Sequence, residues 1–249
     1  MASILDRYGI KEVADVTFYE LNSDETRGAP VLYLDTLKVS TIEQTAENAE
    51  ARGGKGNAAL ISWDYGKEIT VTLEDALYSA KSLAMMFGDN NGASEVSTGS
   101  ITKTVWKSSL SSTTAASAGS TVSVVINGNT VSLTNCTFYK ASGASVTSVT
   151  SGTDYDYVTG TISATTRTID VSANAFPGTY YVTGDTYARS EATGKDEFFQ
   201  FIIPKAKVMS ESNTITLEAE GDPTVFSMSL KVLRPKNGVM MQLVQYTVS

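Results

Sequence analysis

The stretch Glu50–Leu77, EARGGKGNAALISWDYGKEITVTLEDAL, decides the fold of this chain of 249 residues. A polar, glycine-rich segment runs into Leu60–Trp63, LISW, whose composition is typical of a buried strand. Asp64–Gly66 then has the composition of a turn, and Glu68–Thr72 alternates apolar and polar side chains as a half-buried strand does. The stretch therefore predicts a loop followed by two strands of a β-rich protein.

One helix is predicted directly after this strand, over residues 73–87. Thr72 is expected to cap its first turn, with Asp75 at the return position of a capping box and Gly88 closing the end. Glu74 and Asp75 are thereby assigned to the helix N-terminus and not to a catalytic pair. Seven apolar side chains share one face at helical spacing and predict that the helix lies on a sheet: Leu73, Ala76, Leu77, Ala80, Leu83, Ala84 and Phe87.

The segment Glu43–Ala59, EQTAENAEARGGKGNAA, is too rich in glycine and polar residues to belong to a core. We expect a long exposed loop or the tip of a hairpin, and loops of this length within a compact domain are usually functional. Before it, Val16–Leu21 and Val31–Ile42 have strand composition, and the polar Asn22–Pro30 joins them.

The composition fits a globular β protein. With 41% hydrophobic and 18% charged residues the chain can bury a core, and β-branched and aromatic residues are plentiful. The net charge of −8 and the lack of any basic run argue against a protein that grips nucleic acid. No apolar run is long enough to span a membrane, and the first residues lack a secretory pattern, so we expect the protein to be made and kept in the cytoplasm.

The composition changes sharply at Ser94, where a stretch rich in serine and threonine and almost free of charge begins. Two strand-like runs, Thr121–Gly128 and Asn129–Tyr139, meet at Asn127–Gly128, and this dipeptide is a strong hairpin signal because it tolerates positive φ. Further strands are predicted at Tyr155–Ile162, Arg167–Val171 and Gly178–Thr183.

The chain is therefore predicted to consist of one domain interrupted by another. Residues 1–93 and 196–249 form the two parts of the first domain, and residues 94–195 form an inserted β-sandwich. Alternating apolar side chains favour a folded sandwich over disorder, with Ser108–Gly119 as a flexible connection. An immunoglobulin-like topology is one arrangement that this strand spacing allows.

The last part of the chain is predicted to hold four strands. Phe198–Ile203 should end at Pro204, which cannot donate a hydrogen bond inside a sheet. Thr214–Glu220 and Phe226–Val232 alternate as half-buried strands do. A turn containing proline and glycine then reverses the chain, so that Met240–Val248 completes a terminal antiparallel hairpin.

The sequence contains no recognisable catalytic set. The chain has no histidine, which removes the usual general base and the commonest metal ligand. None of the Gly-Lys pairs at 54–55, 66–67 and 194–195 is followed by the Ser or Thr of a P-loop. Cys136 is the only cysteine and is expected to be a small buried side chain. We therefore expect no enzyme, no cofactor and no metal.

Acidic and aromatic residues also have structural explanations. Asp154 and Asp156 are more simply the solvent face of a strand than a hydrolytic pair. Asp89–Glu95, DNNGASE, lacks the glycine spacing of a calcium-binding EF-hand loop. Trp63 and Trp106 are not interleaved with basic residues as in single-strand binders, and we assign them to core and interface packing.

Three segments, taken in this order, resemble the tail tube proteins of tailed bacteriophages: EARGGKGN (50–57), LISWDYGKEITVTLEDAL (60–77) and LRPKNGVMMQLVQY (233–246). QFIIPKAKV (200–208) adds to this resemblance, which covers the flanks and leaves the insertion outside. It implies a mainly β fold, with two packed antiparallel sheets plus one α-helix in the tube domain. It also implies that six copies close into a ring with an inner β-barrel, and that rings stack into a tube.

The function implied by the resemblance is structural. The tube would conduct double-stranded DNA during ejection without binding it tightly, and a tape-measure protein would accompany it in assembly. The subunit would belong to the virion tail and assemble in the host bacterial cytoplasm, with no membrane partner. The insertion must point away from the lumen. It leaves a contractile tail, with a tail sheath as a further partner, and a non-contractile tail equally open.

Candidate assembly residues follow from this resemblance and from the exposed glycine-rich segment. The candidates for ring-to-ring contacts are Arg52, Gly53, Gly54, Lys55 and Gly56. The candidates for lining the lumen, all outward-facing on predicted strands, are Glu68, Thr70, Thr72 and Glu218. An acidic lining would let DNA slide, because like charge forfeits the counterion release that makes DNA binding tight.

Two other functions remain open from the sequence. The same fold could form a single ring as a tail-end or baseplate component. Alternatively, the insertion could carry the activity, as a capsid-decorating or carbohydrate-binding module. Long tubes, single rings or a glycan-binding monomer, seen after purification, would distinguish the three functions.

Overall fold

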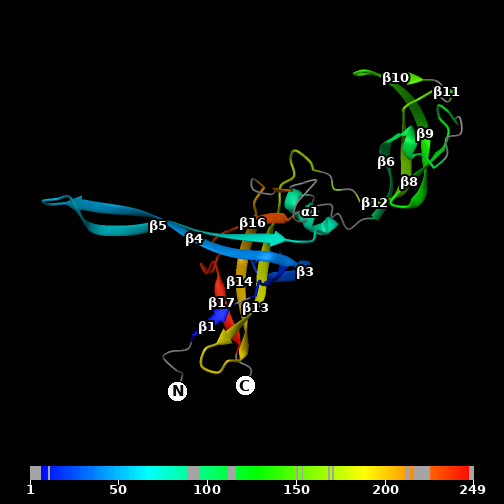
Figure 1. The fold of residues 1–249 in the computed structure, drawn as a ribbon. Helices are drawn as coiled ribbons and strands as arrows, with labels where there is room; N and C mark the ends of the chain where they lie inside the picture. Colours follow the sequence, from blue (N-terminus) through cyan, green and yellow to red (C-terminus); the bar gives the residue numbers. More distant parts are fainter. Residues whose placement is uncertain are drawn as a thin grey trace. The chain divides into compact units, whose positions relative to one another are not determined.

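The computed structural model divides the chain into two compact units, residues 1–93 with 169–249 and residues 94–168 (Figure 1). The structure describes residues 7–10, 12–88, 96–111, 116–149, 151–152, 154–167, 169, 171–210, 214–215 and 225–246. Both units are built from antiparallel strands. The predicted mainly β class, with antiparallel sheets and one α-helix among the described residues, is confirmed.

In the described residues of the larger unit, ten strands form one hydrogen-bonded network. Seven of them follow the order β3-β2-β13-β14-β16-β5-β4, while β1 pairs with β13, β15 with β16 and β17 with β14. Their bounds are β1 Tyr8–Ile10, β2 Asp15–Leu21, β3 Arg27–Leu34, β4 Leu37–Gly53, β5 Ala58–Asp75, β13 Thr179–Ser190, β14 Asp196–Val208, β15 Thr214–Ile215, β16 Phe226–Val232 and β17 Gln242–Tyr246.

The hairpin of β13 and β14 forms the spine of this sheet. One half of β13 pairs with β2 and the other half with β1. In the same way, β14 pairs with β17 over residues 198–202 and with β16 over residues 206–208. Pro204 lies between these two segments and at the register shift between β13 and β14, where the regular ladder is interrupted and a residue without an N–H is tolerated. The strand therefore continues through Pro204, whereas the sequence predicted that it would end there.

The sheet curls back on itself. Its first and last strands, β3 and β4, are consecutive in the chain and are joined only by Asp35 and Thr36. Side chains from all seven strands of the path meet in one core, in which Phe18, Ile203 and Leu230 are fully buried. Their alternation with exposed residues along each strand gives the sheet one apolar face, which the curl closes off from water.

The carboxylate of Glu25 fixes the turn between β2 and β3 through two interactions, which we call the clasp. Glu25 accepts from Lys205 Nζ at 2.7 Å and from the backbone N–H of Lys236 at 2.5 Å. The hydrogen bond from Lys205 and then that from Lys236 lower the pKa of the Glu25 carboxyl. The clasp ties three segments that lie far apart in the sequence to one carboxylate.

The helix α1 covers Ala80–Phe87, so it begins seven residues later than the predicted residue 73. Residues 73–75 belong instead to β5, where Leu73 pairs with Met228. Ser79 is the N-cap, and it forms a capping box with Ser82. The predicted cap with Thr72 and Asp75 is therefore wrong, although Gly88 closes the helix with φ 80° as expected.

Asp75 is buried in the sheet, and its carboxylate accepts a hydrogen bond of 2.5 Å from Thr36 Oγ1. This bond holds the connection between β3 and β4 against β5. It does not lie at the helix N-terminus. The apolar face of α1 presents Met85 and Met86 to the core of the sheet. Residues 73–75 are strand and not helix because two neighbouring strands, β4 and β16, offer them ladder partners and a buried setting. This tertiary pairing outweighs their local helix propensity.

The smaller unit forms a five-stranded sheet in the order β10-β9-β12-β6, with β8 paired to β9, and a two-stranded sheet of β7 and β11. Phe138, Val158 and Val124 are fully buried in its core. Cys136 lies there as expected, and burial raises the pKa of its thiol. The bounds are β6 Val96–Trp106, β7 Ala116–Ser117, β8 Val122–Ile126, β9 Asn129–Ser142, β10 Ser145–Val149, β11 Ser151–Gly152 and β12 Tyr157–Arg167, with a 3-10 turn η1 at Lys107–Ser109.

The predicted hairpin at Asn127–Gly128 is present, with φ of 51° and 79° at the two turn residues. The insertion, however, ends earlier than the predicted residue 195. Strand β13, which includes residues 179–183 of the predicted strand 178–183, pairs with β2 and β14 of the larger unit. The sequence could not assign this strand because its polar, Ser/Thr-containing pattern matches the insertion that precedes it.

The predicted terminal hairpin is also wrong in its pairing. β17 pairs with the first half of β14, while β16 lies between β14 and β5. β16 alternates apolar and polar residues, a pattern that fixes the face of a strand without identifying its neighbour, and β17, QLVQY, has no such alternation.

Gly184 and Phe201 provide a test of the β13–β14 spine. The two residues are paired across the strands, and a Cβ on Gly184 would lie 1.9 Å from the ring atom Cζ of buried Phe201. Gly184→Ala should therefore lower the free energy of unfolding by about 1–3 kcal/mol, because the ring must leave its place in the core. Urea unfolding of the unassembled protein measures this. Gly9→Ala is the matched control, since a Cβ there meets nothing within 4 Å; equal effects of both substitutions would contradict the packing.

Candidate assembly interface

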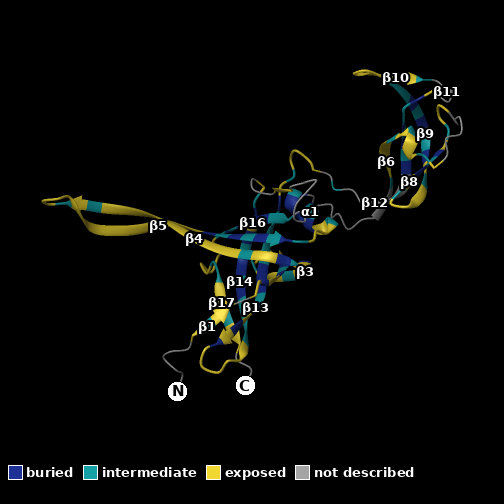
Figure 2. Cartoon of the chain, viewed as in Figure 1, coloured by how far each residue is buried: buried dark blue, intermediate teal, exposed yellow. Residues whose placement is uncertain are grey.

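The hairpin of β4 and β5 extends well beyond the other strands of its sheet (Figure 1). β5 pairs with β16 only over residues 70–75, so the residues nearer the tip have only each other as strand partners among the described residues. We call residues 47–65 the arm. Almost all of the arm is exposed, as the yellow ribbon in Figure 2 shows.

The arm forms because its two strands carry matching alternation. The pairs Glu47↔Tyr65, Ala49↔Trp63 and Ala51↔Ile61 lie on one face, and Asn48↔Asp64 and Glu50↔Ser62 lie on the other. The sequence predicted a turn at Asp64–Gly66, but Gly66, with φ 62°, instead accommodates a register shift in a continuous strand. A glycine in the left-handed region is the usual way to add one residue to a strand without ending it.

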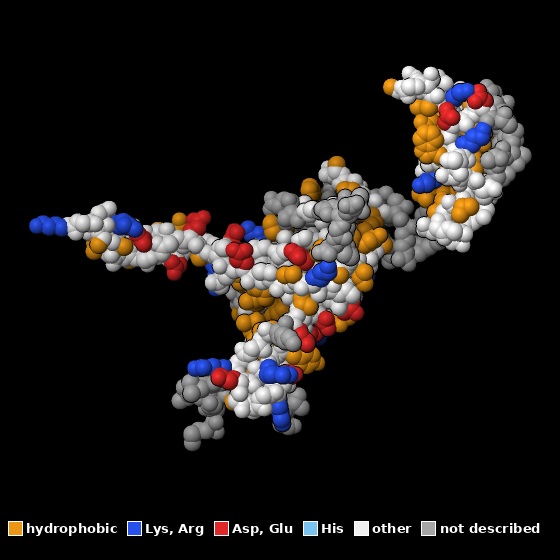
Figure 3. Space-filling model, viewed as in Figure 1, with side chains coloured by type: hydrophobic (Ala, Val, Ile, Leu, Met, Phe, Trp, Pro, Cys, Tyr) orange, Lys and Arg blue, Asp and Glu red, His pale blue; other side chains and the backbone are white. Residues whose placement is uncertain are grey.

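One face of the arm is apolar and uncovered. Ile61, Trp63 and Tyr65 have exposed fractions of 53%, 54% and 52%, and the small side chains of Ala49 and Ala51 lie opposite them. Leu60, at a second register shift near the tip, is 68% exposed. The LISW segment, predicted to be buried, is therefore exposed. Figure 3 shows hydrophobic side chains, in orange, on the surface of the arm.

The opposite face of the arm is polar and internally bonded. Asn48 Nδ2 donates to Asp64 Oδ1 at 2.8 Å and also to Ser62 Oγ. Arg52 pairs with Glu50 at 2.5 Å between Nη2 and Oε2. The arm is therefore amphipathic, with its hydrogen-bonding groups satisfied on one side and its apolar side chains in water on the other.

The five predicted ring-to-ring residues all lie at the tip of the arm. Arg52 and Gly53 end β4, and Gly54, Lys55 and Gly56 form the turn into β5. Gly54 and Gly56 have φ of 78° and 88°, a conformation that disfavours residues with a Cβ. The alternative of a hairpin tip is thus the one that the structure adopts, and these residues are held together as the outermost part of the arm.

Three of the four lumen candidates share one face of the sheet at the base of the arm. Glu68, Thr70 and Thr72 alternate with the buried Ile69, Val71 and Leu73 of the core. Glu68 accepts from Lys231 Nζ of β16 at 2.8 Å. The same face continues across Thr41, Glu43 and Thr45 of β4, which pair with them. Glu218 lies outside the described residues.

An amphipathic two-stranded ribbon is an incomplete structure. Two strands alone bury too little surface to be stable in water, and exposed aromatic clusters of this kind mark interaction sites. The sequence analysis predicted LISW to be a buried strand and assigned Trp63 to core and interface packing, so it did not locate this exposed surface. The sequence does contain a pattern that indicates an amphipathic hairpin. Ile61, Trp63 and Tyr65 alternate with polar residues, and Ala49 and Ala51 on the partner strand alternate with polar residues in the same way.

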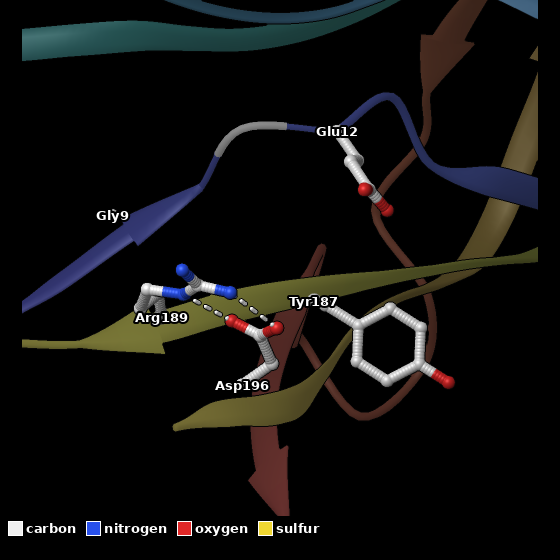
Figure 4. A pocket seen from close by; sticks show the side chains of 5 residues that line it. All are labelled: Gly9, Glu12, Tyr187, Arg189 and Asp196. Carbon is white, nitrogen blue, oxygen red and sulfur yellow. Dashed lines mark hydrogen bonds and ion pairs between the residues drawn. The ribbon is translucent and has the colours of Figure 1, made fainter. Parts of the chain in front are cut away.

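A cavity of about 430 Å³ lies at the other end of the sheet, beside β1 and the β13–β14 hairpin (Figure 4). Gly9, Glu12 and Tyr187 line it together with Arg189 and Asp196, which form a two-pronged ion pair of 2.7 and 2.8 Å across the strands. The guanidinium of Arg189 lowers the pKa of the Asp196 carboxyl. The ion pair is therefore retained in its charged form and links the end of β13 to the start of β14, so we assign these two residues a structural role.

Within the residues described by the structure, no helix is long and apolar enough to cross a membrane. In the same residues, no group of three or more carboxylates and thiols is placed so that it could hold a metal ion.

The chain matches the family model described as YomU/Tube protein family over residues 8–245. The match runs through residues 94–168 as well, which the resemblance of the flanks left outside. No curated protein matches the chain.

Proposed function

The chain belongs to the YomU/Tube protein family, a family of structural tail tube proteins, and we propose that it assembles with itself into stacked rings of six subunits. In this proposal the rings form the tube of a phage tail. The tube is the conduit for DNA ejection, and the subunit has no catalytic task. It is assembled in the host cytoplasm and becomes part of the virion tail.

The exposed apolar face of the arm is the observation that carries this proposal. Trp63 and its neighbours need a partner surface to leave water, and in a homo-oligomer that surface belongs to another copy of the same chain. A neighbouring subunit also offers sheet edges, which ring closure would cover. The tip residues Arg52–Gly56 are then the part of the arm that reaches an adjacent ring.

The polar face with Glu68, Thr70 and Thr72 suits the lumen. Carboxylates and hydroxyls offer DNA no cationic partner, and Lys231 on the same face is already paired with Glu68. The net charge of −8 adds a general repulsion of phosphates. DNA would therefore pass without the counterion release that drives tight binding. A tape-measure protein would occupy the same channel during assembly, and a sheath would lie outside it if the tail is contractile.

Replacing Trp63 tests the role of the arm. Trp63→Ser should leave the subunit folded, because the side chain is half exposed, and raise the protein concentration needed for tube formation roughly ten-fold or more, the effect of losing one aromatic anchor. Negative-stain microscopy across a concentration series gives the result.

The other tryptophan supplies the matched control for this experiment. Trp106 is 57% exposed but lies in the smaller unit, so Trp106→Ser should leave tube formation unchanged. Tubes of Trp63→Ser at the concentration that suffices for the unmodified protein would rule out the arm as an assembly contact.

Introduced cysteines test the lumen assignment. Native Cys136 is 1% exposed and burial raises the pKa of its thiol, so it contributes little background labelling. In assembled tubes, Glu68→Cys and Thr70→Cys should react with a small thiol reagent and resist a bulky one, because only the small reagent diffuses along the channel. Both reagents should label both variants in unassembled protein.

Val125→Cys, on an exposed position of the smaller unit, should react with both reagents in tubes and serves as the control. Bulky labelling of Glu68→Cys or Thr70→Cys in tubes would place the face on the exterior, and resistance to both reagents would place it in a subunit contact.

A further inference from the structure

The smaller unit has an aromatic row on the face of its sheet that points away from its core. Trp106, Tyr157 and Tyr139 are consecutive partners across β6, β12 and β9. The rings of Trp106 and Tyr157 lie 4.3 Å apart between centroids and are tilted by 48°, so they form an angled wall. Trp106 keeps 57% of its surface exposed, although apolar core positions exist on the other face of the same strands.

Rows of threonine follow the aromatic row on the same face. Thr104 and Thr159 are cross-strand partners, and their hydroxyls bond each other at 2.8 Å. Thr161 and Thr134 form the next such pair, at 3.0 Å between hydroxyls. The hydroxyls of Thr134 and Thr161 also donate to each other's backbone carbonyls at 3.2 Å, so this pair offers a ligand acceptor positions only. The exposed pair of Thr104 and Thr159 shares one hydrogen bond, so it keeps a donor and acceptor positions for a ligand.

A hollow of about 360 Å³ lies directly beside Trp106. Lys107, Ser108, Tyr155 and Asp156 complete its lining. Asp156 Oδ2 accepts from the backbone N–H of Ala141 at 2.9 Å, which fixes the carboxylate, and Lys107 Nζ lies 4.6 Å from the centroid of the Tyr155 ring. An aromatic wall thus adjoins a cavity that carries an ammonium group, a carboxylate and a hydroxyl.

The charge of this unit limits the class of ligand. Between Ser94 and Thr168 the sequence has four basic residues and three acidic ones: Lys103, Lys107, Lys140 and Arg167, and Glu95, Asp154 and Asp156. The unit is therefore almost neutral, while the whole chain carries −8. Nucleic acid needs clustered cations, and a strongly charged peptide needs a field of one sign. This face offers neither.

We propose that this face of the smaller unit binds a neutral glycan, with Trp106 and Tyr157 as the stacking surface. A sugar ring has an apolar face of C–H groups, which fits against an exposed aromatic ring, and a rim of hydroxyls, which needs donors and acceptors close by. The threonine rows, Ser108 and Asp156 supply them. The observations favour this ligand because exposed aromatic surface and dense uncharged hydroxyls occur together on one sheet face.

Tryptophan fluorescence tests the proposal on the full chain. In a Trp63→Phe background Trp106 is the only tryptophan, since the chain has two. Neutral chito-, cello-, galacto- and manno-oligosaccharides are titrated in turn, and at least one should shift the emission to the blue in a saturable manner. Trp106→Ala, followed by calorimetry in the unmodified background, should weaken that binding roughly ten-fold or more, as expected for the loss of an aromatic stacking contact.

The matched control is Ile101→Ala, which removes an exposed side chain from the opposite face of the same strand and should leave glycan affinity unchanged. Thermal unfolding of Trp106→Ala should match that of the unmodified protein, because the side chain is largely in solvent. Tyr157→Ala is the second variant and should also weaken binding.

Three outcomes would overturn the proposal: no saturable binding to any of these oligosaccharides, unchanged affinity in Trp106→Ala, or self-association of the protein that Trp106→Ala abolishes. The last result would assign the face to a second copy of the chain. Tube formation is scored separately by microscopy, so failure here is distinguishable from failure of the assembly proposal.

Discussion

A pair of strands that continues past the rest of its sheet can bury an apolar face only on something outside that sheet. This constraint governs the larger unit. The arm presents Ile61, Trp63 and Tyr65 to solvent on one side and satisfies its polar side chains on the other. Hydrophobic burial is the largest favourable contribution to association, and in the proposed assembly a neighbouring subunit would supply the surface that covers this face.

The core makes this arrangement possible by fixing the base of the arm. Ile69, Val71 and Leu73 are buried against β16 and the helix, so β5 enters the arm with a set register and a set face. The register shift at Gly66 then changes which side chains face which way, because one added residue inverts the alternation. The hairpin of β4 and β5 is therefore packed into the core at its base and exposes its apolar side chains near its tip.

Much of the fold was predictable from the sequence because alternation and turn chemistry are local. The Asn127–Gly128 hairpin, the buried Cys136 and the alternation of Glu68–Thr72 followed from neighbouring residues alone. Strand partners did not follow, since β13 and β17 pair with segments that periodicity cannot identify. The helix began late because long-range pairing of residues 73–75 outweighed their helical spacing. An exposed loop or hairpin tip was predicted at residues 43–59, and the structure has the hairpin tip. The exposed faces with Trp63 and Trp106 were not located, because the assignment of aromatic side chains to core and interface packing does not say which of the two applies until their neighbours are known.

Hydrogen exchange of the arm amides, measured in unassembled subunits and in assembled tubes, tests the central claim most directly. In the free subunit, residues 47–65 should exchange much faster than the β13–β14 spine, because a two-stranded ribbon opens at little free-energy cost. On assembly the exchange of these amides should slow by roughly ten-fold or more as the apolar face is covered. Arm amides that exchange at the same rate in subunits and in tubes would contradict the account.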